Sequence, residues 1–263
     1  MTGALDGKVC VVSGALGLIG GELAPALVAE GGLVALTDLD HYACVDRAAS
    51  LGAGALGLGA DVTRPESVAA LRDAVLAWRG RIDALVLCAA IDDRFTPGEG
   101  GGRFEDYPIE QWRRSLDVNV TGTFVCAQLL GREMAARGGG SIVTVASTYG
   151  LVGPDQSLYR RPDRAQAFFK SPAYPTGKAA VIGFTRYLAA YWGPAGVRVN
   201  ALAPGGVANG QEPWFVESYA RRTPLGRMAS ARDLIGAVLF LASDASAYVT
   251  GATLVVDGGW TAW

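Results

Sequence analysis

The sequence has little of what several classes of functional site require. Its 263 residues contain one histidine, His41, and four cysteines without Cys-x-x-Cys spacing. A histidine-based metal cluster is therefore nearly excluded, no disulfide framework is indicated, and we predict no bound metal. His41 follows an expected strand end and is predicted to lie at the surface.

The chain also lacks the signals of a membrane protein or a nucleic-acid-binding protein. No apolar run reaches the roughly 18 residues that a membrane helix needs, and the first residues lack the basic-then-apolar pattern of a signal peptide. The net charge of −2 gives no sign of the basic patch that binds nucleic acid. We therefore expect a cytoplasmic protein that acts on a small molecule, with neither a membrane nor nucleic acid as partner.

What the sequence does contain is a regular alternation of strand and helix patterns. Half of the residues are hydrophobic, which is enough to build a large core. Seven strands are predicted at Lys8–Val12, Leu33–Thr37, Ala55–Ala60, Ala84–Cys88, Ser141–Ala146, Val197–Ala201 and Thr253–Val256. Helices are predicted at Gly17–Glu30, His41–Leu51, Pro65–Trp78, Ile109–Arg137, Ala173–Trp192 and Ala231–Ser243. This order predicts a single α/β domain over residues 1–263, a Rossmann fold with a doubly wound, seven-stranded parallel sheet and helices on both faces.

Three irregular stretches, Ile91–Tyr107, Gly150–Ser171 and Pro204–Arg227, each follow a predicted strand. They therefore lie at the edge where doubly wound sheets bind ligands. Loops of this length in a compact domain are usually functional. We expect a substrate-side insert at residues 151–171 and a lid at residues 205–227.

A glycine-rich turn joins the first predicted strand to the first predicted helix. It reads Ser13-Gly14-Ala15-Leu16-Gly17-Leu18-Ile19-Gly20. Such a turn lets the backbone approach a pyrophosphate, which the N–H groups and the dipole of the helix N-terminus then bind. We predict a dinucleotide site here, and a purely structural tight turn is the alternative.

The end of the second predicted strand indicates which dinucleotide binds. Asp38 can accept hydrogen bonds from the adenosine ribose hydroxyls and would repel a 2′-phosphate. No Arg or Lys stands at Ala15, Leu16 or Leu39 to bind that phosphate. NAD is therefore the predicted cofactor, with NADP less favoured. Asp61, after the third strand, is predicted to accept from the adenine amino group.

These residues and a set of catalytic motifs resemble the classical short-chain dehydrogenase/reductase family over nearly the whole chain. The family's Tyr-x-x-x-Lys signature appears as Tyr174-Pro175-Thr176-Gly177-Lys178, after a serine at the end of the fifth strand and a helix asparagine. The resemblance implies four catalytic residues: Asn119, Ser147, Tyr174 and Lys178. With the turn and Asp38, it implies cofactor contacts from Gly14, Leu18, Ile19, Gly20, Asp38, Leu39, Asp61, Val62, Ala89, Tyr174, Lys178, Pro204, Gly205 and Val207.

The resemblance further implies an oxidoreductase that moves a hydride between NAD(H) and a secondary alcohol or ketone. Tyr174 would be the general acid/base, with its phenolate favoured by Lys178. Ser147 would donate a hydrogen bond to the substrate oxygen, and Asn119 would hold a water that links Lys178 to solvent. In this family the helix that carries Tyr174 pairs between subunits. We therefore expect a homotetramer with 222 symmetry, which would also cover an apolar patch at Trp260 and Trp263.

The chain departs from the family's pattern in four places, one of which is Asn209, where a threonine often contacts the carboxamide. The second glycine of the turn is Gly17, whereas the family has its glycine at the position of Leu18. The family's Asn-Asn-Ala-Gly run is Leu87-Cys88-Ala89-Ala90 here, so local packing must replace the lost side-chain hydrogen bonds. Ser147 and Tyr174 are 27 positions apart, about twice the usual spacing.

The extra residues between Ser147 and Tyr174 carry an excess of positive charge. Arginine suits carboxylate or phosphate recognition, and we predict an anionic substrate group held by at least one insert arginine. A solvated surface segment is the alternative. The predicted substrate contacts are Thr148, Tyr149, Arg160, Arg161, Arg164 and Trp214. The insert and residues 223–228 and 256–263 also resemble a bacterial subgroup associated with surface sugars of the nonulosonic acid type. That likeness favours a sugar- or polyol-like substrate.

Two other functions stay open. A 3-oxoacyl-carrier-protein reductase shares the four catalytic residues but usually prefers NADP, which Asp38 opposes. A non-catalytic NAD-binding regulator on the same fold would be expected to have lost Tyr174 or Lys178, and both are present.

Overall fold

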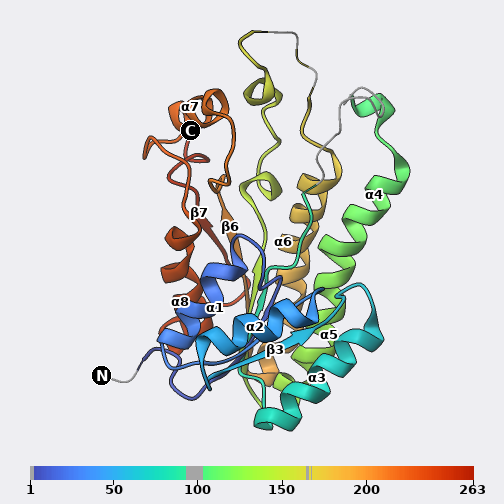
Figure 1. Ribbon diagram of the computed structural model, residues 1–263, viewed down its shortest axis with the longest axis vertical. Helices are drawn as coiled ribbons and strands as arrows, with labels where there is room; N and C mark the ends of the chain where they lie inside the picture. The colour runs from blue at the N-terminus through green and yellow to red at the C-terminus, as the bar shows by residue number, and fades with distance from the viewer. Residues whose placement is uncertain (1–2, 93–102, 164–165, 167) are drawn as a thin grey trace.

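The computed structural model describes residues 3–92, 103–163, 166 and 168–263, and a seven-stranded sheet runs through its centre. The strand order is β3-β2-β1-β4-β5-β6-β7, and each neighbouring pair is parallel. The strands are β1 (Val9–Ser13), β2 (Leu33–Asp38), β3 (Ala55–Gly59), β4 (Ala84–Leu87), β5 (Gly140–Val145), β6 (Val197–Pro204) and β7 (Thr253–Val256). The predicted fold is confirmed (Figure 1).

The inner strands β1, β4, β5 and β6 bury both of their faces, because successive side chains of a strand point to opposite sides of the sheet. In β1, Val9 and Val11 enter one core cluster, whereas Cys10 and Val12 enter the other. This two-sided burial explains the continuous apolar runs of the sequence. β6 extends three residues beyond its predicted end because it pairs with β7 as far as Pro204.

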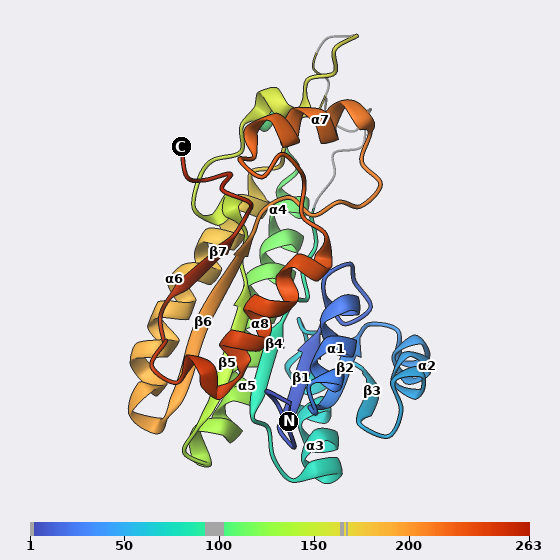
Figure 2. The same ribbon diagram turned by 90° about the vertical axis from the view of Figure 1, so that its left-hand side faces the viewer.

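Helices cover the two faces in separate layers (Figure 2). One layer holds α3 (Pro65–Arg79), α5 (Gly122–Ala136) and α6 (Ala173–Trp192). The other holds α1 (Gly20–Ala29), α2 (His41–Leu51) and α8 (Ile235–Ala242). The first helix begins at Gly20 rather than at Gly17, because the glycine-rich turn takes up the residues before it. His41 is exposed, as predicted.

The predicted helix Ile109–Arg137 is one helical path with a break in its middle. It divides into α4 (Ile109–Leu116), a π-helical turn over Asp117–Thr121, and α5. The wider π turn inserts extra backbone at this point, and such bulges are frequent at functional sites. Asn119, one of the predicted catalytic residues, lies inside it and is buried.

The stretch predicted as irregular at Pro204–Arg227 contains a helix, α7 (Pro213–Arg222). Its first residue is a proline, which is typical of a helix start and is the signal that the prediction missed. α7 and the insert lie at the same end of the molecule, beyond the carboxyl ends of the strands (Figures 1 and 2). None of the described helices combines the length and apolar character of a membrane span.

Candidate active site

The glycine-rich turn after β1 brings two backbone segments closer than any side chain would allow. Gly14 has a φ of +66°, and a Cβ there would lie 2.7 Å from the backbone N of Ala89, after β4. A Cβ at Gly20 would lie 2.2 Å from the carbonyl oxygen of Gly14. The turn is therefore a cradle of bare backbone next to the start of α1, with Leu18 and Ile19 on it. Such a cradle fits a pyrophosphate.

Asp38 joins this cradle to the end of β2. Its Oδ2 accepts a hydrogen bond from the Leu16 N–H at 3.0 Å, and its Oδ1 accepts from the Leu39 N–H at 2.8 Å. A carboxylate oxygen accepts more than one hydrogen bond, so both oxygens keep capacity for ribose hydroxyls. The fixed negative charge at this edge fits the predicted adenosine ribose.

Asp61, after β3, makes its hydrogen bonds within its own turn. Asp61 Oδ1 accepts from the backbone N and the hydroxyl of Thr63, at 2.9 and 2.7 Å. The hydroxyl bond lowers the pKa of Asp61 below its usual range despite partial burial. Val62 is buried, and a Cβ at Gly122 would clash with it at 2.6 Å. The contact of Asp61 with adenine stays a prediction.

The run after β4 shows what replaces the missing asparagines. Ser13 Oγ accepts from the Ala89 N–H at 3.3 Å. The Asn119 amide makes two bonds with Ile91: it accepts from the Ile91 N–H and donates to the Ile91 carbonyl oxygen, both at 2.9 Å. The π turn thus places Asn119 so that its side chain fixes the loop after β4. The predicted water would have to use the main-chain carbonyl of Asn119, which accepts from Thr123 Oγ1 at 2.9 Å.

The structure brings the four predicted catalytic residues together at the carboxyl edge of the sheet. Ser147 follows β5, and its hydroxyl is hydrogen-bonded to Tyr174, in the first turn of α6. Lys178, one turn later and only 3 % exposed, donates from Nζ to the Val145 carbonyl oxygen at 2.7 Å. Asn119 lies against Gly177, beside Lys178.

Burial has a large effect on the protonation of this group. Burial, assisted by the charge of Asp92, raises the pKa of Tyr174 above its usual range, and the effect expected from Lys178 stays a prediction. The hydrogen bond from Ser147 acts in the opposite direction but is the smaller effect. Burial also lowers the pKa of Lys178 to about 8. In the protein alone, desolvation therefore favours the neutral form of both groups.

Pro204, Gly205 and Val207 lie at the same edge, after β6. Gly205 donates to the Val256 carbonyl oxygen at 3.0 Å, and a Cβ there would lie 2.9 Å from Asp257. Val207 forms an isolated bridge with Ala229. The structure thus gathers all the predicted cofactor residues on one edge, because parallel strands end together.

Aromatic side chains form a wall between the insert and α7. The hydroxyls of Tyr149 and Tyr159 lie 3.0 Å apart, and the Tyr159 ring packs against Phe168 and Phe215. Trp260 packs against Tyr149 and stacks on Tyr219. The prediction that Trp260 belongs to an exposed patch is therefore wrong, because its ring fills this wall. Trp263 is 82 % exposed.

The arginines that were predicted to bind the substrate have different surroundings in the structure. Arg161 forms ion pairs with Asp163 at 3.3 Å and with Glu212 at 3.5 Å, and it lies over the Trp214 ring on α7. Arg160 is exposed, and Arg164 lies outside the described residues. Thr148 is buried next to Ser147. A substrate role for the arginines stays a prediction.

The sequence reasoning missed a pair of charges beside Tyr174. Lys170, at the end of the insert, has its Nζ 4.6 Å from the centre of the Tyr174 ring and 2.5 Å from both carboxylate oxygens of Asp92. The position of Lys170, four residues before Tyr174, is the signal that was available. Asp92 comes from the loop after β4, 78 positions away, so the pairing needed the fold.

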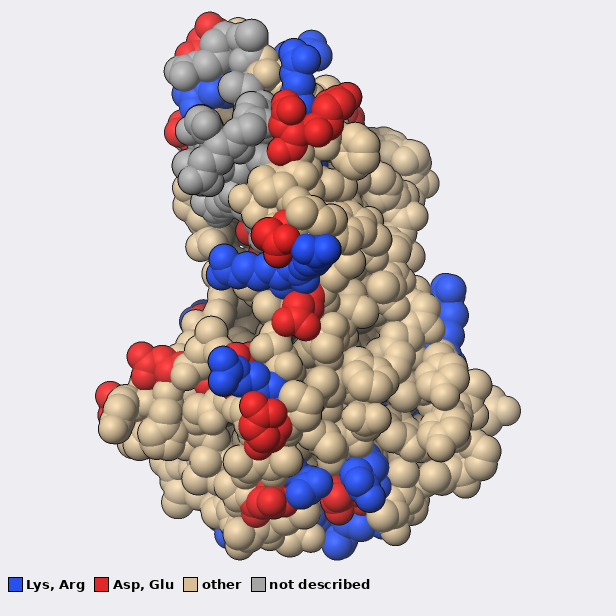
Figure 3. Space-filling view, turned by 90° about the vertical axis from the view of Figure 1, so that its right-hand side faces the viewer, with Lys and Arg blue, Asp and Glu red and all other residues tan. Residues whose placement is uncertain are grey.

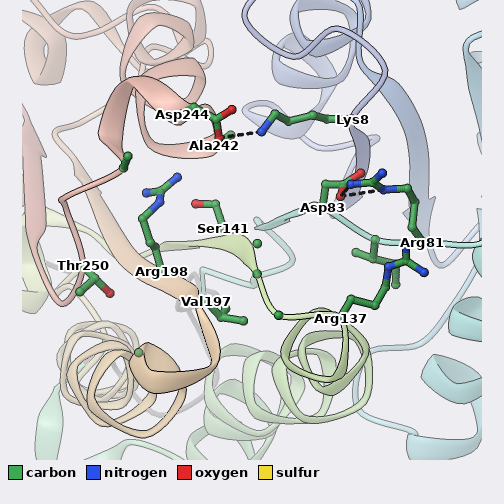
Figure 4. A pocket seen from close by; sticks show the side chains of 17 residues that line it. Lys8, Arg81, Asp83, Arg137, Ser141, Val197, Arg198, Ala242, Asp244 and Thr250 are labelled. Atoms are coloured by element: carbon green, nitrogen blue, oxygen red, sulfur yellow. Dashed lines mark hydrogen bonds and ion pairs between the residues drawn. The ribbon is translucent and has the colours of Figure 1, made fainter.

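A polar cavity of about 600 Å³ lies at the opposite edge, where the strands begin (Figure 4). Two ion pairs border it, Lys8 with Asp244 and Arg81 with Asp83, and Arg137 donates to the Gly80 carbonyl oxygen at 3.1 Å. Arg198 donates to the carbonyl oxygens of Leu241 and Ser243 at the end of α8. The charged groups around the cavity therefore hold the fold together. The cavity lies at the opposite edge of the sheet from the four predicted catalytic residues.

On the face shown in Figure 3, the described basic and acidic side chains alternate and form no continuous basic patch. Among the described residues, no group of three or more His, Cys, Asp or Glu side chains is arranged to hold a metal ion. The four cysteines are free thiols.

Comparisons with known proteins agree with this geometry. Residues 14–261 match the sequence family described as Enoyl-(Acyl carrier protein) reductase. The chain is 38 % identical over 265 residues to D-threitol dehydrogenase of Mycolicibacterium smegmatis, covering 98 % of this chain and 94 % of that protein. It is 39 % identical over 271 residues to galactitol 2-dehydrogenase (L-tagatose-forming) of Cereibacter sphaeroides, covering 98 % and 97 %.

Two solved structures are similar over 98 % of the chain. A short-chain dehydrogenase from Leptospira borgpetersenii with bound NAD+ has a TM-score of 0.85 at 32 % identity, with 94 % of that chain covered. A gluconate 5-dehydrogenase from Burkholderia cenocepacia, in complex with NADP and tartrate, has a TM-score of 0.85 at 30 % identity, with 97 % covered. Sequence and structure thus agree over almost the full length, and the chain belongs to the short-chain dehydrogenase/reductase family.

Proposed function

We propose that the protein is an NAD-dependent dehydrogenase that interconverts a secondary alcohol and a ketone on a polyol- or sugar-like substrate. The observation that carries this proposal is the meeting of Ser147, Tyr174 and Lys178 at the edge that also holds the glycine cradle and Asp38. A non-catalytic NAD-binding regulator would have no need for this arrangement.

The proposed chemistry follows from the positions of these side chains. In the direction of oxidation, the phenolate form of Tyr174 accepts the hydroxyl proton of the substrate and becomes the neutral phenol, and Ser147 donates a hydrogen bond to the same substrate oxygen. Lys178 holds the nicotinamide ribose and brings a positive charge next to the phenol. A bound nicotinamide supplies the hydride acceptor. The insert and α7, the proposed lid, exclude water from this edge.

Two lines of argument support a polyol- or sugar-like substrate. The relatives named above oxidise threitol and galactitol according to their names, and the aromatic wall is lined with the hydroxyls of Tyr149 and Tyr159. The subgroup associated with surface sugars stays a prediction from the insert and the last residues. A spectrophotometric screen of polyols, amino sugars and 3-oxoacyl thioesters, with NAD and NADP in parallel, tests the proposal. Activity confined to acyl thioesters would favour the acyl-carrier-protein reductase instead.

NAD is expected to give the higher kcat/KM, because the fixed carboxylate of Asp38 repels a 2′-phosphate. Asp38→Ala should reduce the NAD-to-NADP ratio by about tenfold or more, which corresponds to roughly 1.4 kcal/mol. Asp40→Ala is the matched control, since Asp40 caps α2 through the Ala43 N–H. It should lower the Tm but leave the ratio unchanged. Steady-state kinetics showing NADP as the better cofactor of the wild type would contradict this assignment.

We also propose that the protein is a homotetramer with 222 symmetry. α5 and α6 expose a connected aromatic stripe: Phe124 (43 % exposed) touches Phe184, which stacks with Tyr187 (62 %), and Tyr187 stacks with Tyr191 (64 %). An uncovered stripe of this size is typical of an interface. Light scattering at micromolar concentration should give the mass of four chains. Tyr187→Arg with Tyr191→Arg should lower that mass, whereas Tyr42→Arg, at an exposed tyrosine of α2, should not. A monomeric wild type would rule out the assembly.

A further inference from the structure

The pair formed by Lys170 and Asp92 is held by two similar clamps. Lys170 donates its backbone N–H to Gln156 Oε1 at 2.8 Å, and its carbonyl oxygen accepts from Gln156 Nε2 at 3.3 Å. Ile91, next to Asp92, is held in the same two-bond manner by Asn119. A side-chain amide thus fixes the backbone at or beside each partner. Such fixing is typical of groups that must meet a ligand in one geometry.

The two partners differ in their exposure. The Lys170 side chain is 9 % exposed and lies between the rings of Tyr174 and Tyr149, at 4.6 and 5.9 Å from their centres. The Asp92 side chain is 48 % exposed. Because both oxygens of Asp92 meet the same ammonium, each keeps lone pairs for further donors. The ammonium has three hydrogens, so it too can donate to a further acceptor.

The charge of the pair limits what can bind to it. A hydroxyl both donates and accepts, so it can bind to Asp92 and Lys170 together without bringing a charge into the pocket. A carboxylate or phosphate that accepted the remaining Lys170 hydrogen would bring a second negative charge next to Asp92, and the two like charges would repel. Displacing Asp92 instead would separate a part-buried ion pair and leave one charge without its partner, which is strongly unfavourable.

The position of the pair indicates which hydroxyl it meets. Tyr174 contacts the reacting oxygen, and the Lys170 ammonium lies over the same ring. A hydroxyl on a neighbouring carbon of the substrate is therefore within reach of Lys170. We propose that Asp92 and Lys170 form the substrate-selecting site of this enzyme, which binds a second hydroxyl of a neutral polyol and disfavours anionic substrates. This inference rests on the proposed function and specifies its substrate class.

Three four-carbon probes separate the contributions to recognition: 2-butanol has one hydroxyl, D-threitol adds neighbouring hydroxyls, and threonate adds a carboxylate. The wild type should show at least a tenfold higher kcat/KM for threitol than for either of the others. Lys170→Met should lower kcat/KM for threitol by about 10- to 100-fold, the effect of losing one hydrogen bond from a charged donor. It should change the value for 2-butanol by less than about threefold. Asp92→Asn should raise the ratio of kcat/KM for threonate to kcat/KM for threitol by about tenfold, because the positive charge of Lys170 is then no longer balanced by a carboxylate.

Asp155→Asn is the matched control. Asp155 pairs with Arg222 of α7, so this change also removes an insert ion pair but leaves Lys170 in place. It should leave the ratios among the three probes unchanged. If Lys170→Met does not fold, as judged by circular dichroism, Lys170→Arg replaces it. That variant keeps the charge and should retain the preference for threitol over threonate.

The outcomes distinguish this inference from the proposed function. A wild type that oxidises 2-butanol or threitol with NAD or NADP, but uses threonate equally well, overturns the inference alone and favours the insert arginines as an anion site. An equal loss for 2-butanol and threitol in Lys170→Met also overturns it, because Lys170 would then act through Tyr174. A wild type that oxidises none of the alcohols overturns the proposed function, and the inference with it.

Discussion

Tyr174→Phe is expected to lower kcat/KM for alcohol oxidation by about 10²–10⁴, because it removes the group that takes the proton. The phenol is buried and hydrogen-bonded to Ser147, and no other described acidic or basic side chain is hydrogen-bonded to Ser147. Phenylalanine has almost the same shape, so the fold and NAD binding should persist. Steady-state rates and quenching of tryptophan fluorescence by NAD measure the two effects separately.

Tyr248→Phe is the control for this experiment. It removes the same atom from a fully exposed tyrosine outside every proposed site and should leave the rate unchanged. If Tyr174→Phe kept more than half of the wild-type rate, the assignment of the general base would be wrong.

Lys178→Met is expected to have two opposite effects: a loss of activity of about 10² or more and a more stable fold. Burial lowers the pKa of Lys178 from 10.5 to about 8. A shift of that size corresponds to roughly 3 kcal/mol against folding at pH 7. Methionine removes this cost but also loses the bond to the Val145 carbonyl, worth about 1 kcal/mol. The net gain at pH 7 is about 2 kcal/mol.

The pH dependence of this gain follows from the direction of the shift. Between pH 8 and pH 10.5 the unfolded chain binds the Lys178 proton and the native protein does not, so wild-type stability rises with pH across this window. The net advantage of Lys178→Met should therefore be full below pH 8, fall to zero near pH 10 and become a small deficit above pH 10.5, where only the lost Val145 bond counts. Thermal unfolding of the NAD-free proteins at pH 7 and pH 10 measures it. A lower Tm than wild type at pH 7 would show that the Val145 bond outweighs desolvation.

The sheet and the four catalytic residues could be predicted because the sequence patterns that indicate them lie within short segments of the chain. Apolar runs of four to six residues predict buried parallel strands wherever helices separate them, and the strand ends then place Gly14, Asp38 and Ser147 on one edge. The i, i+4 spacing of Tyr174 and Lys178 places both on one helix face. These inferences need no knowledge of contacts between distant segments.

The substrate side could not be predicted because it is built from distant contacts. No sequence pattern indicated that Arg161 forms an ion pair with Glu212. Glu212, the residue before α7, is 51 positions away along the chain and comes close to Arg161 only in the folded protein. Trp260 looked exposed near the end of the chain, but Tyr149 and Tyr219 cover its ring. The raised pKa of Tyr174 could not be predicted because it comes from burial, which sequence patterns do not measure.

The insert carries several of its own anchors. Gln156 holds Lys170 within the segment, and Asp155 ties the segment to Arg222. Exposed residues between these anchors, such as Arg160, can therefore be exchanged without altering Ser147 or Tyr174. Sequence changes in the insert can therefore alter which alcohol is bound while the reaction stays the same. The same positions are suitable for engineering substrate specificity.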